Sequence, residues 1–119
     1  MKKLSENEIQ IYLENELPNW THIGNKLQRT FTTANWQATL MVSNAIAFIA
    51  ESVWHHPELI LNYNSVKINL NTHDINGITL KDIELAQLVD SIVIWKPSKK
   101  SLLTGNPEEW IKDGENSRE

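Results

Sequence analysis

The amino-acid sequence predicts an α+β fold, in which a four-stranded antiparallel sheet has helices packed on one face. Three observations predict it: apolar residues recur at helical spacing in three separate segments, they alternate with polar residues in the segments between, and turn residues separate paired strands. The expected order is α-β-β-α-β-β-α, which is typical of an antiparallel sheet covered by helices. A chain of 119 residues is long enough for one hydrophobic core.

The first helix is predicted to begin after Ser5. Ser5 and Glu8 have the spacing of a capping box, in which each side chain accepts a hydrogen bond from the backbone amide of the other residue. Ile9 and Leu13 lie on one face of this helix, and the sequence at residues 17–19 ends it because Pro18 disfavours continuation.

Two hairpins are predicted, each with two short strands around a tight turn. Apolar and polar residues alternate from Val66 to Thr72, so this strand is expected to have one buried and one solvent-facing side. The strands are expected at residues 20–23, 27–32, 60–63 and 66–72, with turns at 24–25 and 64–65.

The second helix is predicted from a cap at Thr33 to about Trp54. Residues 34–50 carry no charge, but polar residues interrupt this run and it is short for a membrane span, so we expect a helix of a globular domain. Its apolar residues cover more than the one stripe that a sheet-covering helix needs. The surplus predicts an oligomer contact, and it consists of Trp36, Met41, Ala45 and Phe48.

The third helix is predicted from Thr79, which forms a second capping box with Asp82, to about Trp95. The domain is expected to span residues 1–96, followed at residues 97–119 by a linker and a polar tail. Asn106 and Pro107 have the types preferred at the start of a short helix, and residues 113–119 are expected to be disordered.

Composition excludes several function classes. Eleven basic and fifteen acidic residues give a net charge of −4, which argues against a nucleic-acid partner, since phosphate contacts need clustered Lys and Arg. The absence of cysteine excludes disulfides and thiolate metal sites. The first residues turn acidic at once and contain no apolar signal core, so a cytoplasmic protein without a membrane partner is expected.

The candidate chemistry lies in an imidazole pair, His55 and His56, placed where Pro57 must end the second helix. Glu51 is four residues before His55, so the two are predicted to share a helix face, and a carboxylate there would fix which ring nitrogen carries the proton. His56 precedes the proline and is therefore expected to leave the helical conformation and point elsewhere.

A third imidazole, His73, follows the last predicted strand, and Asp82 lies in the first turn of the next helix. Because strand ends and helix ends gather at one edge of such a layer, these groups are expected to surround one pocket with the imidazole pair. Simpler interpretations remain open: Asp82 as a helix cap, Glu51 as a solvated residue, His73 as a surface residue. Three histidines and an acid also suit zinc, but adjacent residues on a helix do not face one another, and no HExxH spacing is present.

These residues form an ordered series that resembles the pterin-4a-carbinolamine dehydratases. The series is Glu51 followed by His55-His56-Pro57, then a Tyr63-Asn64 turn, Thr72-His73-Asp74 and a following Asp82, and the resemblance covers about residues 17–93. Leu59 and the turn Ile75-Asn76-Gly77 depart from the family pattern, and the tail from Lys96 onward has no counterpart in it.

The resemblance implies removal of water from a 4a-hydroxytetrahydropterin, without metal or organic cofactor, because the pterin is the substrate. It implies that His55 and His73 act as acid and base, that His56 holds the substrate, and that Glu51 and Asp82 orient the histidines. It places Trp20 near the pocket, and implies either a homodimer, in which the sheets of two copies join, or a homotetramer, which packs through the long central helix. The residues implied to contact the pterin are His55, His56, Pro57, Thr72, His73, Asp74 and Ile75.

A second function class shares this fold. Some relatives are binding modules that act as coactivators or as assembly factors, with no need for the imidazoles. The present sequence contains all three histidines and both carboxylates, which favours the enzyme.

Overall fold

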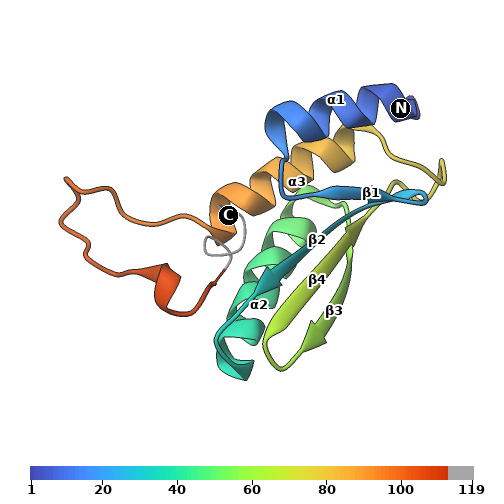
Figure 1. The fold of residues 1–119 in the computed structure, drawn as a ribbon. Coiled ribbons are helices and arrows are strands. Elements are labelled where there is room, and N and C mark those ends of the chain that lie inside the picture. Colours follow the sequence, from blue (N-terminus) through green and yellow to red (C-terminus); the bar gives the residue numbers. More distant parts are fainter. Residues whose placement is uncertain (113–119) are drawn as a thin grey trace.

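The structure, a computed structural model, describes residues 1–112 and confirms the α+β class (Figure 1). The expectation for residues 113–119 lies outside the described residues. The elements are α1 (Glu6–Glu16), β1 (Thr21–Ile23), β2 (Lys26–Thr32), α2 (Trp36–Val53), β3 (Glu58–Asn62), β4 (Ser65–Leu70), α3 (Leu80–Val93) and the 3₁₀ turn η1 (Pro107–Glu109).

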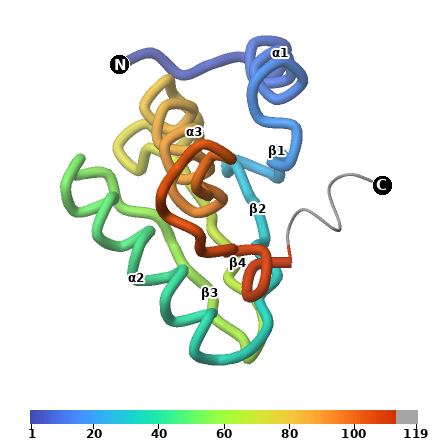
Figure 2. The backbone as a smooth tube through the Cα atoms, turned by 90° about the vertical axis from the view of Figure 1, so that its left-hand side faces the viewer, coloured from blue at the N-terminus to red at the C-terminus, as the bar shows by residue number. Residues whose placement is uncertain are grey.

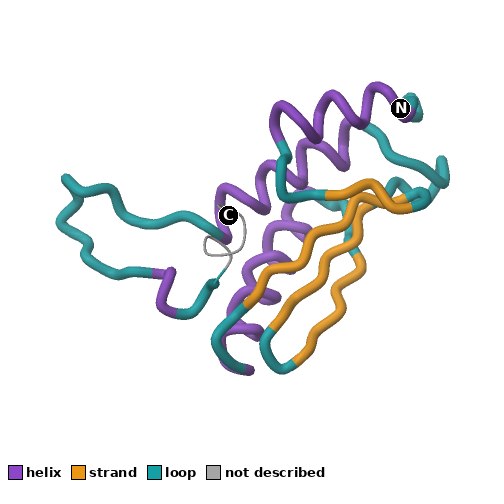
Figure 3. Tube along the Cα trace, viewed as in Figure 1, coloured by secondary structure: helices purple, strands orange, loops and turns teal. Residues whose placement is uncertain are grey.

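The four strands form one antiparallel sheet in the order β1-β2-β4-β3. The central pair places Phe31 opposite Val66 and Leu27 opposite Leu70, so that large apolar side chains face the same side. All four of these side chains are fully buried, and the helices cover that face (Figures 2 and 3). The hydrophobic core therefore lies between the sheet and the helical layer.

Helix capping confirms two predictions and corrects one. The capping boxes Ser5–Glu8 and Thr79–Asp82 are both present. The cap of α2 is Asn35, whose Oδ1 accepts the Ala38 amide at 2.9 Å; the prediction of Thr33 is wrong. Thr33 is still part of the extended chain after β2, where it forms an isolated β-bridge with Ile111.

Strand and helix ends differ from the predictions by about two residues. β3 begins at Glu58 rather than residue 60, and α3 ends at Val93 rather than Trp95. β4 ends at Leu70 because the chain then turns: the Thr72 amide donates to the Gly77 carbonyl at 2.8 Å. This turn carries His73.

Residues 95–112, here the C-terminal segment, loop away from the end of α3 and return to the sheet (Figure 1). The predicted short helix is confirmed as η1, with Asn106 as its cap. Ile111 is buried, and the Lys112 amide donates to the Thr32 carbonyl at 2.8 Å. The segment thus contacts the core domain at its far end, while the proposed domain boundary at residue 96 stays a prediction.

The surplus apolar residues of α2 lie at the surface of the single chain. Phe48 is 74% exposed, and Trp36 and Met41 are about half exposed. None of the helices in residues 1–112 combines the length and the apolar character needed to span a bilayer.

Candidate active site

The end of α2 positions the imidazole pair. Trp54 adopts the left-handed conformation, with φ 58° and ψ 48°. The His55 amide then donates to the Ala50 carbonyl at 3.1 Å and the Trp54 amide to the Glu51 carbonyl at 3.3 Å, the pattern of a Schellman motif. Glycine is the usual residue at this position, because a bulky side chain there is strained. The strained turn directs His55 and His56 away from the helix axis.

His55 pairs with Asp82, at the start of α3. Its Nε2 lies 2.7 Å from Asp82 Oδ1, and Asp82 is fully buried. The second oxygen, Oδ2, accepts the Thr72 hydroxyl and the Thr79 amide, both at 2.9 Å. Asp82 therefore caps its helix and also holds an imidazole, so the two interpretations offered by the sequence are both realised.

His56 pairs with Glu51: Nε2 lies 2.9 Å from Glu51 Oε1. The predicted pairing of Glu51 with His55 is wrong, because the left-handed Trp54 ends the helix before the i, i+4 relationship is completed. The Trp54 ring also meets the His56 ring edge-on, with centroids 4.8 Å apart. Glu51 and His56 are both exposed, in contrast to the buried Asp82.

The third histidine lies on the turn that follows β4. The residue before it, Thr72, donates a hydrogen bond to Asp82. His73 is therefore adjacent in sequence to a residue that contacts the His55–Asp82 pair. His73 and Asp74 are exposed and Ile75 is half-buried. Within residues 1–112, no side-chain hydrogen bond or ion pair fixes His73. Its ring is thus placed by the turn alone.

Trp20 takes part in a second hydrogen-bond network, which includes Asp90 of α3. It is buried, and its indole N–H donates to both carboxylate oxygens of Asp90, at 3.0 and 3.1 Å. Asp90 also pairs with the buried Arg29 of β2 at 2.5 Å. Asp90 is eight residues beyond Asp82, about 12 Å along α3. This network was not predictable from the sequence, since the residue pattern does not link positions so far apart in the chain.

A cavity of about 180 Å³ opens beside His55. It is lined by apolar residues of α2 and α3 and by two charged residues, Lys81 and Glu84. Neither His56 nor His73 lines it. The sequence analysis missed Lys81 and Glu84, although both lie within one turn of Asp82 on α3, which was a signal for their proximity.

In the described part of the chain, no three His, Asp or Glu side chains are grouped closely enough to hold a metal ion. The arrangement instead supplies two imidazole–carboxylate pairs from consecutive residues. Such pairs hold an imidazole in one orientation and one tautomer, which is the requirement for positioned proton transfer.

Known proteins are similar to this chain in sequence and in fold. The family model of pterin 4 alpha carbinolamine dehydratase matches residues 2–92. A relative from Aquifex aeolicus, named "Putative pterin-4-alpha-carbinolamine dehydratase", is 45% identical over 93 residues, which cover 78% of this chain and 93% of the relative. A relative of the same name from Chloroflexus aurantiacus is 41% identical and covered to 99%.

Two solved structures share the fold. The crystal structure of a transcriptional coactivator/pterin dehydratase from Brucella melitensis aligns with a TM-score of 0.71 and 29% identity, covering 76% of this chain and 98% of that one. A pterin dehydratase-like protein identified as a RuBisCO assembly factor in the alpha-carboxysome aligns with a TM-score of 0.50 and 19% identity, covering 60% and 83%, which supports the fold alone. The match over residues 2–92 and these identities show that the chain belongs to the pterin 4 alpha carbinolamine dehydratase family.

Proposed function

We propose that the protein removes water from a 4a-hydroxytetrahydropterin and so returns the pterin cofactor of aromatic amino acid hydroxylases to use. The observation that carries the proposal is the pairing of His55 with the buried Asp82, next to a second imidazole–carboxylate pair and to the turn that bears His73. Family membership supports the same reaction.

The reaction needs one acid and one base. The C4a–O bond breaks, and the hydroxyl leaves as water after it takes a proton from the acid. The base removes the proton of N5, and the electron pair of that N–H bond forms the C4a=N5 double bond of the quinonoid dihydropterin. An imidazole suits either role, and a positioned acid or base contributes typically about 10²–10⁴-fold to a rate.

His55 is the better positioned of the catalytic candidates. The Asp82 carboxylate accepts a hydrogen bond from Nε2 of His55. The proton is thus held on that nitrogen, and Nδ1 is left to exchange a proton with the substrate. Burial of Asp82 and its bonds to Thr72 and Thr79 keep this orientation rigid. Asp82 thus acts through His55, as a positioning residue.

His73 and His56 complete the proposed site. The exposed His73 serves as the second acid–base group, and His56, oriented by Glu51, holds the pterin ring. The backbone of residues 55–57 and 72–75 lines the ring and supplies donors and acceptors for its amide and amino edges. No metal or organic cofactor takes part in this proposal.

Stopped-flow kinetics on chemically prepared 4a-hydroxytetrahydropterin tests the proposal. Wild type is expected to accelerate dehydration over buffer, and His55→Ala and His73→Ala to lose about 10²–10⁴-fold each. His22→Ala is the matched control, since this fourth histidine lies in β1. A wild-type rate equal to that of buffer would remove the enzymatic proposal, and loss of activity with a chelator would remove its metal-free form.

The same assay separates the enzyme from a binding or assembly module, which would be inactive while folded.

We also propose that the protein is a cytoplasmic homo-oligomer, a dimer or a tetramer. The support is the apolar outer face of α2, where the exposed Phe48 and Met41 would be covered by a second copy.

A further inference from the structure

The C-terminal segment lies outside the part of the chain that matches the family. The family model ends at residue 92, and the Aquifex and Chloroflexus relatives are almost fully covered by 93 matched residues. The segment nevertheless has defined contacts. An ion pair between Lys96 and Glu108 at 2.8 Å joins its two arms, and a β-bridge between Ile111 and Thr33 joins its far end to the chain after β2.

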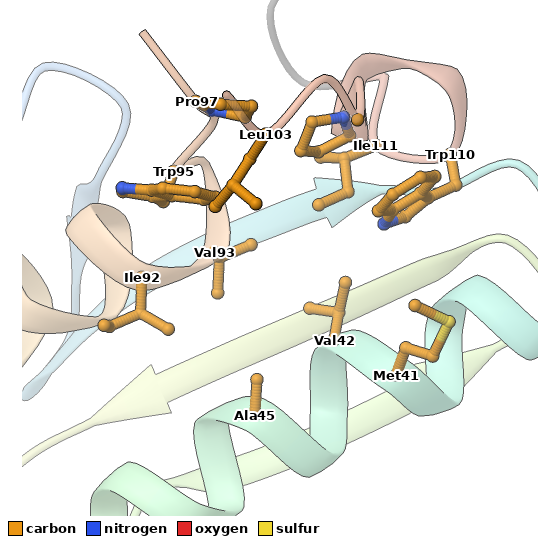
Figure 4. Close-up of a pocket in the computed structure, with 12 residues that line it drawn as sticks. Met41, Val42, Ala45, Ile92, Val93, Trp95, Pro97, Leu103, Trp110 and Ile111 are labelled. Atoms are coloured by element: carbon orange, nitrogen blue, oxygen red, sulfur yellow. The ribbon is translucent and has the colours of Figure 1, made fainter. Parts of the chain in front are cut away.

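Between this segment and the helices lies a cavity of about 350 Å³. Figure 4 shows its walls: Met41, Val42 and Ala45 project from α2 on one side, and the C-terminal segment closes the other side. α3 contributes two further apolar residues near its end. The volume falls within the range of about 300–1,000 Å³ that small-molecule sites occupy.

The chemistry of the lining is almost wholly apolar. No residue that lines the cavity has a charged side chain, and the polar side-chain groups in the lining are the indole N–H groups of Trp95 and Trp110. Trp95 is 56% exposed and Leu103 67% exposed, although both line the cavity. Covering such surface is favourable by about 25 cal/mol per Å². The segment therefore walls one side of the cavity, which stays open to solvent.

Two possible occupants fit poorly. The residues after Lys112 are Asp-Gly-Glu-Asn-Ser-Arg-Glu, which contain no large apolar side chain that would suit this lining. A second copy on the outer face of α2 would cover Met41 from outside, over a broad face of about 800 Å² per partner, but it would not fill a concave hollow that is walled by three elements of one chain.

We propose that this cavity binds an uncharged, largely aromatic or hydrocarbon small molecule. An ionised ligand is excluded by the lining, because burial of a charge without a partner is costly. Ala45 is eight residues before Val53, where α2 ends next to His55, which is about 12 Å along the helix. The site is therefore separate from the proposed catalytic site and does not depend on the proposed reaction.

Fluorescence titration of the full chain with N-phenyl-1-naphthylamine, a neutral aromatic probe, tests the proposal. Saturable binding of one probe per chain is expected, with energy transfer from the lining tryptophans. Ala45→Phe fills the cavity and is expected to weaken binding at least tenfold. Ala47→Phe makes the same change two residues away, at an exposed position outside the lining, and is expected to bind as wild type does.

A further pair of variants keeps the test decisive if Ala45→Phe folds poorly. Trp95→Phe and Trp110→Phe are expected to reduce energy transfer from protein to probe while the protein stays folded. Three results would overturn the proposal: no saturable binding, equal weakening by Ala45→Phe and Ala47→Phe, or one probe bound per two chains, which would place the probe between two copies.

Discussion

His55 and Asp82 are 27 positions apart in the chain, yet Nε2 of the histidine lies 2.7 Å from Oδ1 of the aspartate. The other carboxylate oxygen accepts the Thr79 amide that begins α3. One buried side chain thus fixes both the start of a helix and the orientation of an imidazole. Asp82 therefore contributes both to the stability of the fold and to the geometry of the proposed site.

Asp82→Asn tests this link. The asparagine oxygen can still accept the Thr79 amide, but its amide group replaces the acceptor that holds the His55 proton on Nε2. We expect kcat to fall about tenfold or more, and KM to change little, because His55 is misoriented rather than removed. A cost of about 1–3 kcal/mol in the free energy of unfolding is expected for the mismatched buried groups.

Stopped-flow kinetics and urea denaturation of the same Asp82→Asn preparation provide the measurements. Glu109→Gln is the control, because it makes the same carboxylate-to-amide change at an exposed residue outside the proposed site. An unchanged kcat in Asp82→Asn would show that His55 needs no orientation by the carboxylate.

The strained Trp54 gives a second prediction. Trp54→Gly relieves a left-handed conformation that costs a non-glycine residue about 1–2 kcal/mol, partly offset by the greater flexibility of glycine in the unfolded chain. We expect a net stabilisation below about 1 kcal/mol. Activity is expected to fall, because the ring that meets His56 edge-on is lost.

Trp54→Ala separates these two effects. Alanine removes the ring but keeps the strain, so we expect the same loss of activity without the gain in stability. Thermal unfolding and dehydration kinetics of both variants are the measurements. If Trp54→Gly were as active as wild type, the tryptophan would have no part in placing His56.

Much of the fold was predictable because its signals are local. Both capping boxes, the two hairpins and the Asn106 cap involve residues within a few positions of one another, and the structure confirms them. Four of the predicted site residues, Glu51, His55, His56 and Asp82, contact one another in pairs, while their roles stay a prediction. The partners within each pair were not predictable, since the i, i+4 rule assumes a helix that continues through His55.

What sequence reasoning missed depends on contacts between distant residues or on backbone geometry. The left-handed turn at Trp54 has no signal in the residue type, because glycine or asparagine would be expected there. The contact of Trp20 with Asp90 joins residues 70 positions apart. The cap is Asn35 rather than Thr33 because the chain stays extended after β2, where Thr33 forms a β-bridge with the distant Ile111.

The pair formed by Arg29 and Asp90 gives a third prediction. The Arg29 side chain is 1% exposed and that of Asp90 19% exposed. Asp90→Ala removes a carboxylate from a buried guanidinium and is expected to cost about 3–5 kcal/mol in the free energy of unfolding. Urea denaturation with an unchanged m-value is the measurement.

The double variant Arg29→Met/Asp90→Leu is the matched comparison for Asp90→Ala. It removes both charges and fills the space with apolar groups, so it is expected to recover the part of the lost stability that the unpaired guanidinium causes. The Trp20 N–H loses its acceptor in both variants and does not affect the comparison. A double variant no more stable than Asp90→Ala would show that the charge pair is not the source of the effect.

The outer face of α2 gives a fourth prediction, for the proposed oligomer. Phe48→Asp places a charge at the most exposed large apolar residue of this helix and is expected to shift sedimentation toward smaller species. Ile11→Asp makes a similar apolar-to-charged change at an exposed residue of α1, away from the outer face of α2, and is expected to leave the distribution unchanged. Identical profiles for wild type and Phe48→Asp would place the oligomer contact elsewhere.

The capping box of α1 gives a prediction about pH. The hydrogen bond from the Ser5 backbone amide, together with the nearby Lys2 charge, holds the pKa of Glu8 below its usual value of 4.5. A carboxyl group whose pKa is lower in the folded state than in the unfolded state stabilises the fold above the unfolded pKa. This stabilisation is lost as pH falls through the folded pKa.

Glu8→Ala is therefore expected to lower the free energy of unfolding at neutral pH, and the difference from wild type should shrink as pH falls below 4.5. Urea denaturation across a pH series measures it. Glu6→Ala is the control, because Glu6 lies in the same first turn but outside the capping box. A difference for Glu8→Ala that stayed constant down to the lowest pH would mean that helix propensity, and not the charged cap, accounts for it.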